Sequence, residues 1–168
     1  LSGLGASEAV SGLTAAINNF NSAGLSSAEI LNKLSAAAIS AAVSEKDLIE
    51  GIKRSGSVAT QAGVSFDELI GVITAVQAKT ARGGAVIGNS FKTIFTRIQS
   101  IEKLKTMQNL GIEVTDAGGE VLGATKLIQN LAKALADVPD ARRLQIAENL
   151  VGKFQIAPFL TILDDYSQ

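Results

Sequence analysis

The sequence predicts an all-α fold: a compact multi-helix domain of about seven helices, with a short β-hairpin-like or loop insert near residues 112–122. Composition supports this, because 46% of the 168 residues are hydrophobic, only 4% are aromatic and there are two prolines. Apolar content made mostly of Ala, Leu and Ile favours helices. Repeated helix-capping signals and apolar residues at helical spacing point the same way.

Three serines mark expected helix starts, since an acidic residue follows each of them three positions later. The pairs are Ser26 with Glu29, Ser44 with Asp47, and Ser65 with Glu68. The serine oxygen can accept a hydrogen bond from a first-turn N–H, and the acid suits the positive end of the helix. The predicted helices cover 8–20, 27–42, 45–61 and 66–81. Gly24 and Gly63 suit the left-handed position that ends a helix.

The next expected helix, over 85–108, follows a break at Arg82-Gly83-Gly84 and has the clearest periodicity in the chain. Its apolar stripe consists of Ile87, Phe91, Ile94, Phe95, Ile98 and Ile101. Lys92, Thr96, Gln99 and Lys103 fall on the opposite face. We therefore expect one side of this helix to be buried and the other exposed, with Gly111 ending it.

Residues 112–122 differ in character, because valines and the pair Gly118-Gly119 are typical of a small hairpin or an extended loop. Helical spacing resumes from Leu127 to Leu135. Pro139 ends that helix or begins the next, which Gly152 closes. Pro158 fits the first turn of a final helix that extends through Leu163.

The residue types that are missing exclude several classes of chemistry. The chain has no His and no Cys, so it cannot build a Ser-His-Asp or Cys-His nucleophile system, a zinc site of the usual ligands, an iron–sulfur cluster or a disulfide framework. With no Trp and one Tyr, it offers few platforms on which single-stranded nucleic acid could stack. We predict no catalytic residue, no metal site and no cofactor.

A cationic stretch between residues 79 and 105 is the candidate contact site. It contains Lys79, Arg82, Lys92, Arg97, Lys103 and Lys105, opposed by Glu102 alone. Such a cluster fits a surface that faces DNA or the acidic wall of a tube. The cluster also fits the solvated face of an amphipathic helix, which is the more common reason for such a run of charges. The net charge of −1 does not mark the whole chain as a binder of polyanions.

Domain organisation is expected to be simple. Residues 1–62, rich in Ala and Ser, form a helical lead-in, and residues 63–168 form the larger core, although one continuous domain over 1–168 fits equally. No apolar run reaches the length of a transmembrane helix. The segment from Ala28 to Val43 suits packing through small side chains, with contact to a membrane as the alternative. The last pattern has no obvious end, so we expect a fragment of a longer chain.

Residues 47–165 contain six blocks whose order and spacing resemble the core region of phage tail tape measure proteins. The blocks are Asp47-Leu48 with Ala59 to Leu69, Ile70 to Val76, Phe91 to Gln99, Leu110 to Val114 with Asp116 and Gly118-Gly119, Ile128 to Ala132, and Leu150 to Gly152 with Pro158 to Leu160. Residues 1–46 match less distinctly. The turn after Val76 departs from the family pattern, because it carries Lys79 and Arg82 where small residues and acids are usual.

The resemblance implies a structural, non-enzymatic protein of the virion. Members of this family are long helical chains that thread the tail tube, set tail length, nucleate tube assembly and leave the tube at DNA ejection. The implied partners are tail tube, baseplate or tail-tip proteins, assembly chaperones and other copies of the chain, with transient contacts to DNA and the host membrane. The implied location is the tail lumen or tip, after assembly in the host cytoplasm.

Two alternatives remain open at this point. The chain could be the helical scaffold of a tail-tip protein whose membrane-active or peptidoglycan-degrading part lies elsewhere. It could also be a tape-like adaptor of a contractile injection system.

Overall fold

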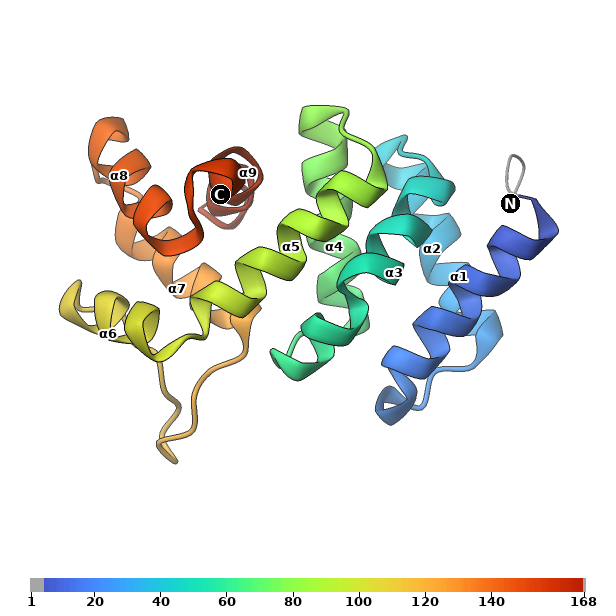
Figure 1. Cartoon of the computed structure of the whole chain (residues 1–168), viewed down its shortest axis with the longest axis horizontal. Coiled ribbons are helices and arrows are strands. Elements are labelled where there is room, and N and C mark those ends of the chain that lie inside the picture. Colours follow the sequence, from blue (N-terminus) through green and yellow to red (C-terminus); the bar gives the residue numbers. More distant parts are fainter. Residues whose placement is uncertain (1–4, 168) are drawn as a thin grey trace. The chain divides into compact units, whose positions relative to one another are not determined.

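The computed structural model describes residues 5–167, which form helices joined by short connections (Figure 1). This part of the chain contains nine α-helices, α1 to α9, and two short 3-10 helices, η1 and η2. The predicted all-α class is confirmed, whereas the predicted number of about seven helices was too low. Two compact units form, unit 1 from residues 1–92 and unit 2 from residues 93–168.

The boundary between these units falls within a helix, since α5 (Gly84–Ile98) continues past residue 92. The predicted division into a lead-in over 1–62 and a core over 63–168 is not the same as the division into these two units, and it stays a prediction. Each unit is described separately below.

Unit 1 is built from consecutive helices that pack side by side. They are α1 (Ala6–Asn19), η1 (Asn21–Ala23), α2 (Ser27–Ala41), α3 (Glu45–Gln61), α4 (Phe66–Thr80) and the first part of α5. α1 packs on α2 and α3, and both of these pack on α4. The rings of Phe20 and Phe66 meet edge to face with centroids 5.2 Å apart. Ile30, Leu48 and Leu69 are also fully buried in this unit.

The three serine signals all begin helices, as predicted. Ser26 and Ser65 form complete capping boxes with Glu29 and Glu68, in which serine oxygen and glutamate carboxylate each accept a backbone N–H bond. Ser44 accepts a bond from the N–H of Asp47, but here the acidic side chain points elsewhere. These caps satisfy backbone donors that a helix start leaves unpaired.

Glycine allows the start of α5 to lie directly against α3. A Cβ atom built on Gly84 would lie 1.8 Å from the carbonyl oxygen of Asp47, and one built on Gly88 would lie 2.6 Å from that of Gly51. No side chain fits in such spaces. The small residues of this region therefore permit close helix approach.

Unit 2 contains the end of α5 and four further helices. These are α6 (Ile101–Asn109), α7 (Ala124–Leu135), α8 (Asp140–Val151) and α9 (Ile156–Tyr166), with η2 (Lys153–Gln155) between α8 and α9. α9 packs on both α7 and α8. The core of unit 2 is mainly aliphatic, and Leu127, Leu131 and Leu150 are among its fully buried residues. Its fully buried aromatic residues are Phe95 and Phe159. Pro158 lies in the first turn of α9, as predicted.

The prediction of a single helix over 85–108 was wrong, because this segment forms two helices. α5 ends at Ile98 and α6 begins at Ile101, with Ser100 in an extended conformation between them. The first five members of the predicted stripe are buried, but Ile101 is 74% exposed because it belongs to the second helix. The side-chain amide of Gln99 donates to the carbonyl oxygen of Leu122 at 3.1 Å, which holds the break against a distant loop.

Of the two forms predicted for the 112–122 insert, a β-hairpin-like segment or a loop, the loop is the one that forms. No strand forms within residues 5–167, and the insert is a loop with one isolated antiparallel bridge, between Thr115 and Val121. The Asp116 carboxylate accepts bonds from the N–H groups of Gly118 (2.8 Å) and Glu120 (3.0 Å). This side chain thus bonds its own turn. Two backbone bonds of 2.9 Å, from the N–H of Leu122 to the carbonyl oxygen of Val114 and from the N–H of Asp116 to that of Glu120, also close the loop.

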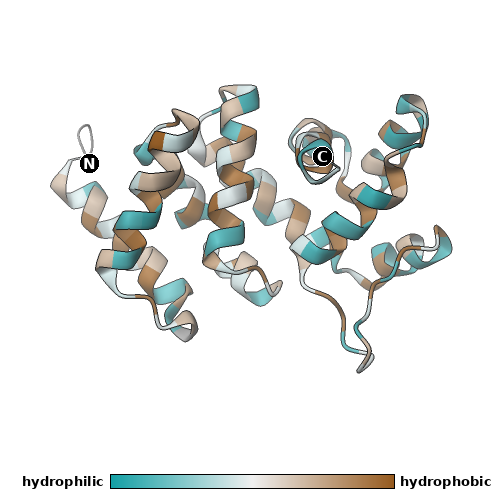
Figure 2. Ribbon diagram, turned by 180° about the vertical axis from the view of Figure 1, so that it is seen from behind, coloured by the Kyte–Doolittle hydropathy of each residue, from teal (hydrophilic) through white to brown (hydrophobic). Residues whose placement is uncertain are grey.

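Figure 2 shows hydrophobic and hydrophilic residues together on most helices, as expected for helices that bury one face. Three residues of α2 are buried, at the helical spacing of Ile30, Leu34 and Ala38. This supports the packing interpretation of the segment from Ala28 to Val43. Among the helices that the structure describes, none has both the length and the apolar content needed to cross a bilayer.

Candidate functional site

The six predicted contact residues are divided between the two units. Lys79, Arg82 and Lys92 belong to unit 1, and Arg97, Lys103 and Lys105 belong to unit 2. Lys79, Arg82, Lys92 and Lys105 are exposed. In unit 1, Lys79 lies in the last turn of α4 and Arg82 lies just beyond it. These two residues place positive charge at the C-terminal end of α4.

Lys103 lies in a different environment from the exposed cations, since its residue is only 7% exposed. Its ammonium donates to the Glu102 carboxylate at 2.7 Å and to Oδ1 of Asn149 at 3.5 Å. The bond and charge of Lys103 hold the pKa of Glu102 below its usual range. The neighbouring acid therefore largely neutralises this cation, because charges at this distance cancel at longer range.

Arg97 is half-buried and bonds to the protein itself. Its Nε donates to the carbonyl oxygen of Leu150 at 3.2 Å, in the last turn of α8. The carbonyl groups of a helix end carry partial negative charge and lack helical partners, so a cation there is stabilising. Arg97 thus ties the end of α5 to the end of α8 within unit 2.

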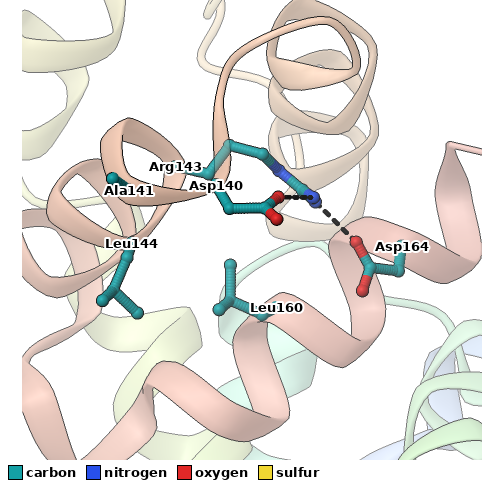
Figure 3. Close-up of a pocket in the computed structure, with 6 residues that line it drawn as sticks. All are labelled: Asp140, Ala141, Arg143, Leu144, Leu160 and Asp164. Atoms are coloured by element: carbon teal, nitrogen blue, oxygen red, sulfur yellow. Dashed lines mark hydrogen bonds and ion pairs between the residues drawn. The ribbon is translucent and has the colours of Figure 1, made fainter.

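A pocket between α8 and α9 was not predicted from the sequence (Figure 3). It has a volume of about 310 Å³ and is lined by Asp140, Ala141, Arg143, Leu144, Leu160 and Asp164. The Arg143 guanidinium lies between two carboxylates, at 2.5 Å from Asp164 and 3.8 Å from Asp140. Leu144, 46% exposed, adds apolar surface beside these charges.

A second pocket lies in unit 1, where α2 and α4 end and α3 and α5 begin. Its volume is about 440 Å³, and Asp47, Gln77 and Arg82 are among the residues that line it. Arg82 is the one predicted contact residue that lines any pocket described here. Sequence reasoning missed Asp47 and Gln77, whose roles depend on contacts between residues at least 30 positions apart.

These surfaces offer charges, hydrogen bonds and small apolar walls to a partner. Within residues 5–167, no three acidic side chains are grouped so that they could hold a metal ion. The arrangement suits protein contacts, in which shape and paired charges give specificity.

Comparison with known proteins identified a family model and a relative that match this chain. The model of the family described as phage-related minor tail protein matches residues 1–152. A tape measure protein of Pneumococcus phage Dp-1 is 28% identical to the chain over 120 residues, which cover 70% of this chain. The match spans about a tenth (10%) of the length of that protein. No solved structure gave a significant match.

Proposed function

The chain belongs to the family of phage-related minor tail proteins, and on that premise we propose that it is a compact helical segment of a tape measure protein. The observation that carries the proposal is the family match over residues 1–152, joined by the similarity to a tape measure protein. The full protein then sets tail length, nucleates assembly of the tail tube and leaves the tube at DNA ejection. Its role is spatial rather than chemical.

The physical basis of such a ruler is the constant rise of a helix, about 1.5 Å per residue. As one continuous helix, 168 residues would span about 250 Å. In the described residues the longest helix has 17 residues, and helices within each unit pack side by side. This segment therefore adds less length than an extended helix with the same number of residues.

The proposal also assigns partners and a location. The partners are tail tube and baseplate or tail-tip proteins, tail assembly chaperones and other copies of the chain. The segment is carried in the virion, in the tail lumen or at its tip, after assembly in the host cytoplasm. The apolar surface around Leu144 and the exposed Phe154, which is 81% exposed, offers contact area for these proteins.

Duplication of residues 1–168 in frame within the parent gene tests the ruler role. We expect longer tails by electron microscopy, with an increase below about 250 Å because the segment folds compactly. A matched control duplicates 168 residues of an extended helical stretch of the same parent and adds about 250 Å. Tails of unchanged length in both strains would contradict the proposal.

We assign the contact to DNA or to the tube wall to the exposed cations, which are Lys79, Arg82 and Lys92 in unit 1 and Lys105 in unit 2. Arg97 and Lys103 form bonds within unit 2 and support its fold. Binding of a labelled DNA duplex should be detectable at low salt and fall steeply as salt rises. Replacement of the four exposed residues by Gln should abolish it. Failure of the unchanged chain to bind even at low salt would exclude a DNA contact.

A further inference from the structure

The pocket between α8 and α9, here called the α8/α9 groove, has an apolar level and an acidic level. On α8, Leu144 follows Asp140 by four residues, and on α9, Asp164 follows Leu160 by four residues. Because the chain turns back at η2 between these helices, both leucines line one part of the groove and both aspartates the other (Figure 3). Each wall therefore places a leucine and an aspartate one turn apart, about 6 Å along the helix axis.

The acidic level keeps a net negative charge. Arg143 lies between the carboxylates of Asp140 and Asp164, so one cation meets two acids. The closer carboxylate is that of Asp164, whereas Asp140 is 3.8 Å away and its side chain is fully exposed. The Asp140 carboxylate can thus pair with a cation that arrives from outside. An incoming helix with an apolar residue and a cation one turn apart would match both levels of the groove.

Helix α6 of this same chain presents such a pair on its exposed face. Ile101 is 74% exposed, and Lys105, four residues later, is exposed on the same side of the helix. Lys103 and Met107 are the buried residues of α6 and lie on its opposite side. Among the exposed large apolar residues of the described part of the chain, Ile101 is the one with an exposed cation one turn away on the same α-helix.

We propose that α6 of one copy of the chain docks in the α8/α9 groove of a second copy. α6 lies antiparallel to α8, which places Ile101 at the apolar level, between Leu144 and Leu160. Lys105 then lies at the acidic level, beside Asp140. The two surfaces differ, so the contact is head-to-tail and leaves a free groove on one copy and a free α6 on the other.

Contact between copies belongs to the proposed function, on which this inference rests, and the inference adds the two surfaces and their direction. In a copy whose α6 is docked, Lys105 pairs with a carboxylate. The contact to DNA or to the tube wall then falls to the three exposed cations of unit 1.

Sedimentation equilibrium of the whole 168-residue chain, up to about 1 mM because a contact made by one short helix is weak, measures the association. Ile101→Glu and Leu144→Glu each place a charge at an exposed position of one surface, and each should weaken association at least about tenfold. Ile39→Glu, at an 81% exposed residue of α2 in unit 1, is the matched control that keeps full affinity. An unchanged chain that stays monomeric would overturn the proposal, as would equal losses in all three variants.

An equal mixture of Ile101→Glu and Leu144→Glu separates a head-to-tail contact from a self-complementary one. The first variant keeps an intact groove and the second keeps an intact α6. Together they should associate with the affinity of the unchanged chain and stop at dimers, which also shows that both are folded. A mixture that stays monomeric would refute the proposal, and so would dimers formed by Ile101→Glu alone.

A charge exchange tests the antiparallel direction. Lys105→Glu and Asp140→Lys should each weaken association about two- to fivefold, the value of one exposed ion pair, and the double variant should return to within about twofold of the unchanged chain. A double variant weaker than both single ones would overturn this placement. Duplication of residues 1–168 leaves both surfaces intact, so the tail-length result and the association result fail separately.

Discussion

The carboxylate of Asp47 in α3 accepts a hydrogen bond of 2.7 Å from the backbone N–H of Gly84, the first residue of α5. A side chain from one helix thus pairs a donor at the start of another helix, 37 residues further along the chain. In the two complete capping boxes, Glu29 and Glu68 reach back to their own serine instead. The shorter side chain at position 47 serves a tertiary contact.

Asp47→Ala should lower the free energy of unfolding by about 1–3 kcal/mol, because the Gly84 N–H loses its acceptor in a partly buried place. Asp47→Asn keeps an oxygen that can accept this bond and should cost less. Urea denaturation measures both, with Asp137→Ala at an exposed position as the control, expected within about 0.5 kcal/mol of the unchanged chain. Equal stabilities of the Asp47→Ala and control variants would contradict this role.

Gly88→Ala should destabilise the fold by about 1–3 kcal/mol, because its methyl group would lie 2.6 Å from the carbonyl oxygen of Gly51. Gly71→Ala is the matched control within a helix, since nothing lies within 4 Å of a Cβ there. That control should stabilise by about 0.5–1 kcal/mol, through helix propensity. Thermal unfolding of both variants gives the signs, and a stabilising Gly88→Ala would disprove the close contact of α3 and α5.

The stability of the α2 start should depend on pH through Glu29. Hydrogen bonds from the hydroxyl and the backbone N–H of Ser26 hold the pKa of this carboxyl below its usual value. A lowered pKa in the folded state means that the ionised form stabilises the fold. This contribution is complete above the pKa of an unfolded glutamate and disappears as pH falls through the lowered folded value.

Thermal unfolding between neutral and acidic pH should therefore show a loss of stability that Glu29→Gln reduces. NMR titration of the Glu29 carboxyl carbon provides the direct measurement. A midpoint at or above that of an ordinary glutamate would argue against the capping box.

Arg143 should couple energetically to Asp164 more strongly than to Asp140. The first pair is 2.5 Å apart and the second 3.8 Å, and the side chain of Asp140 is fully exposed. In double-mutant cycles with alanine, we expect about 0.5–1 kcal/mol for Arg143 with Asp164, since water still reaches that carboxylate. Coupling to Asp140 should be near zero and fall further in high salt. The reverse order of coupling would contradict the geometry of Figure 3.

Several helix boundaries followed from short stretches of sequence. The prediction of 45–61 coincides with α3, and 66–81 and 27–42 each exceed the observed helix by one residue. Serine caps and left-handed glycines act on backbone groups within four or five residues, so their effect does not depend on the rest of the fold. The resemblance to tape measure proteins is likewise a property of residue order, and the family match supports it.

The break between α5 and α6 could not be predicted in this way. Residues 98–101 contain neither Gly nor Pro, and the apolar spacing continues through Ile101. Gln99 leaves the helical pattern to bond the loop at Leu122. The same break turns Lys103 from the expected polar face into a buried position, so a cation counted in the candidate contact site is largely neutralised.

The sequence by itself determined the helical class, the family and the caps of α2, α3 and α4, because these depend on neighbouring residues. Only the tertiary structure decided that Asp47 accepts a bond from the start of α5, that Lys103 is buried and Lys105 exposed, and that the buried Oε1 of Gln77 has no hydrogen-bond partner. The reason is physical. Capping acts within one helical turn, whereas burial and pocket formation depend on which distant segments meet, and that is settled by packing of the whole unit.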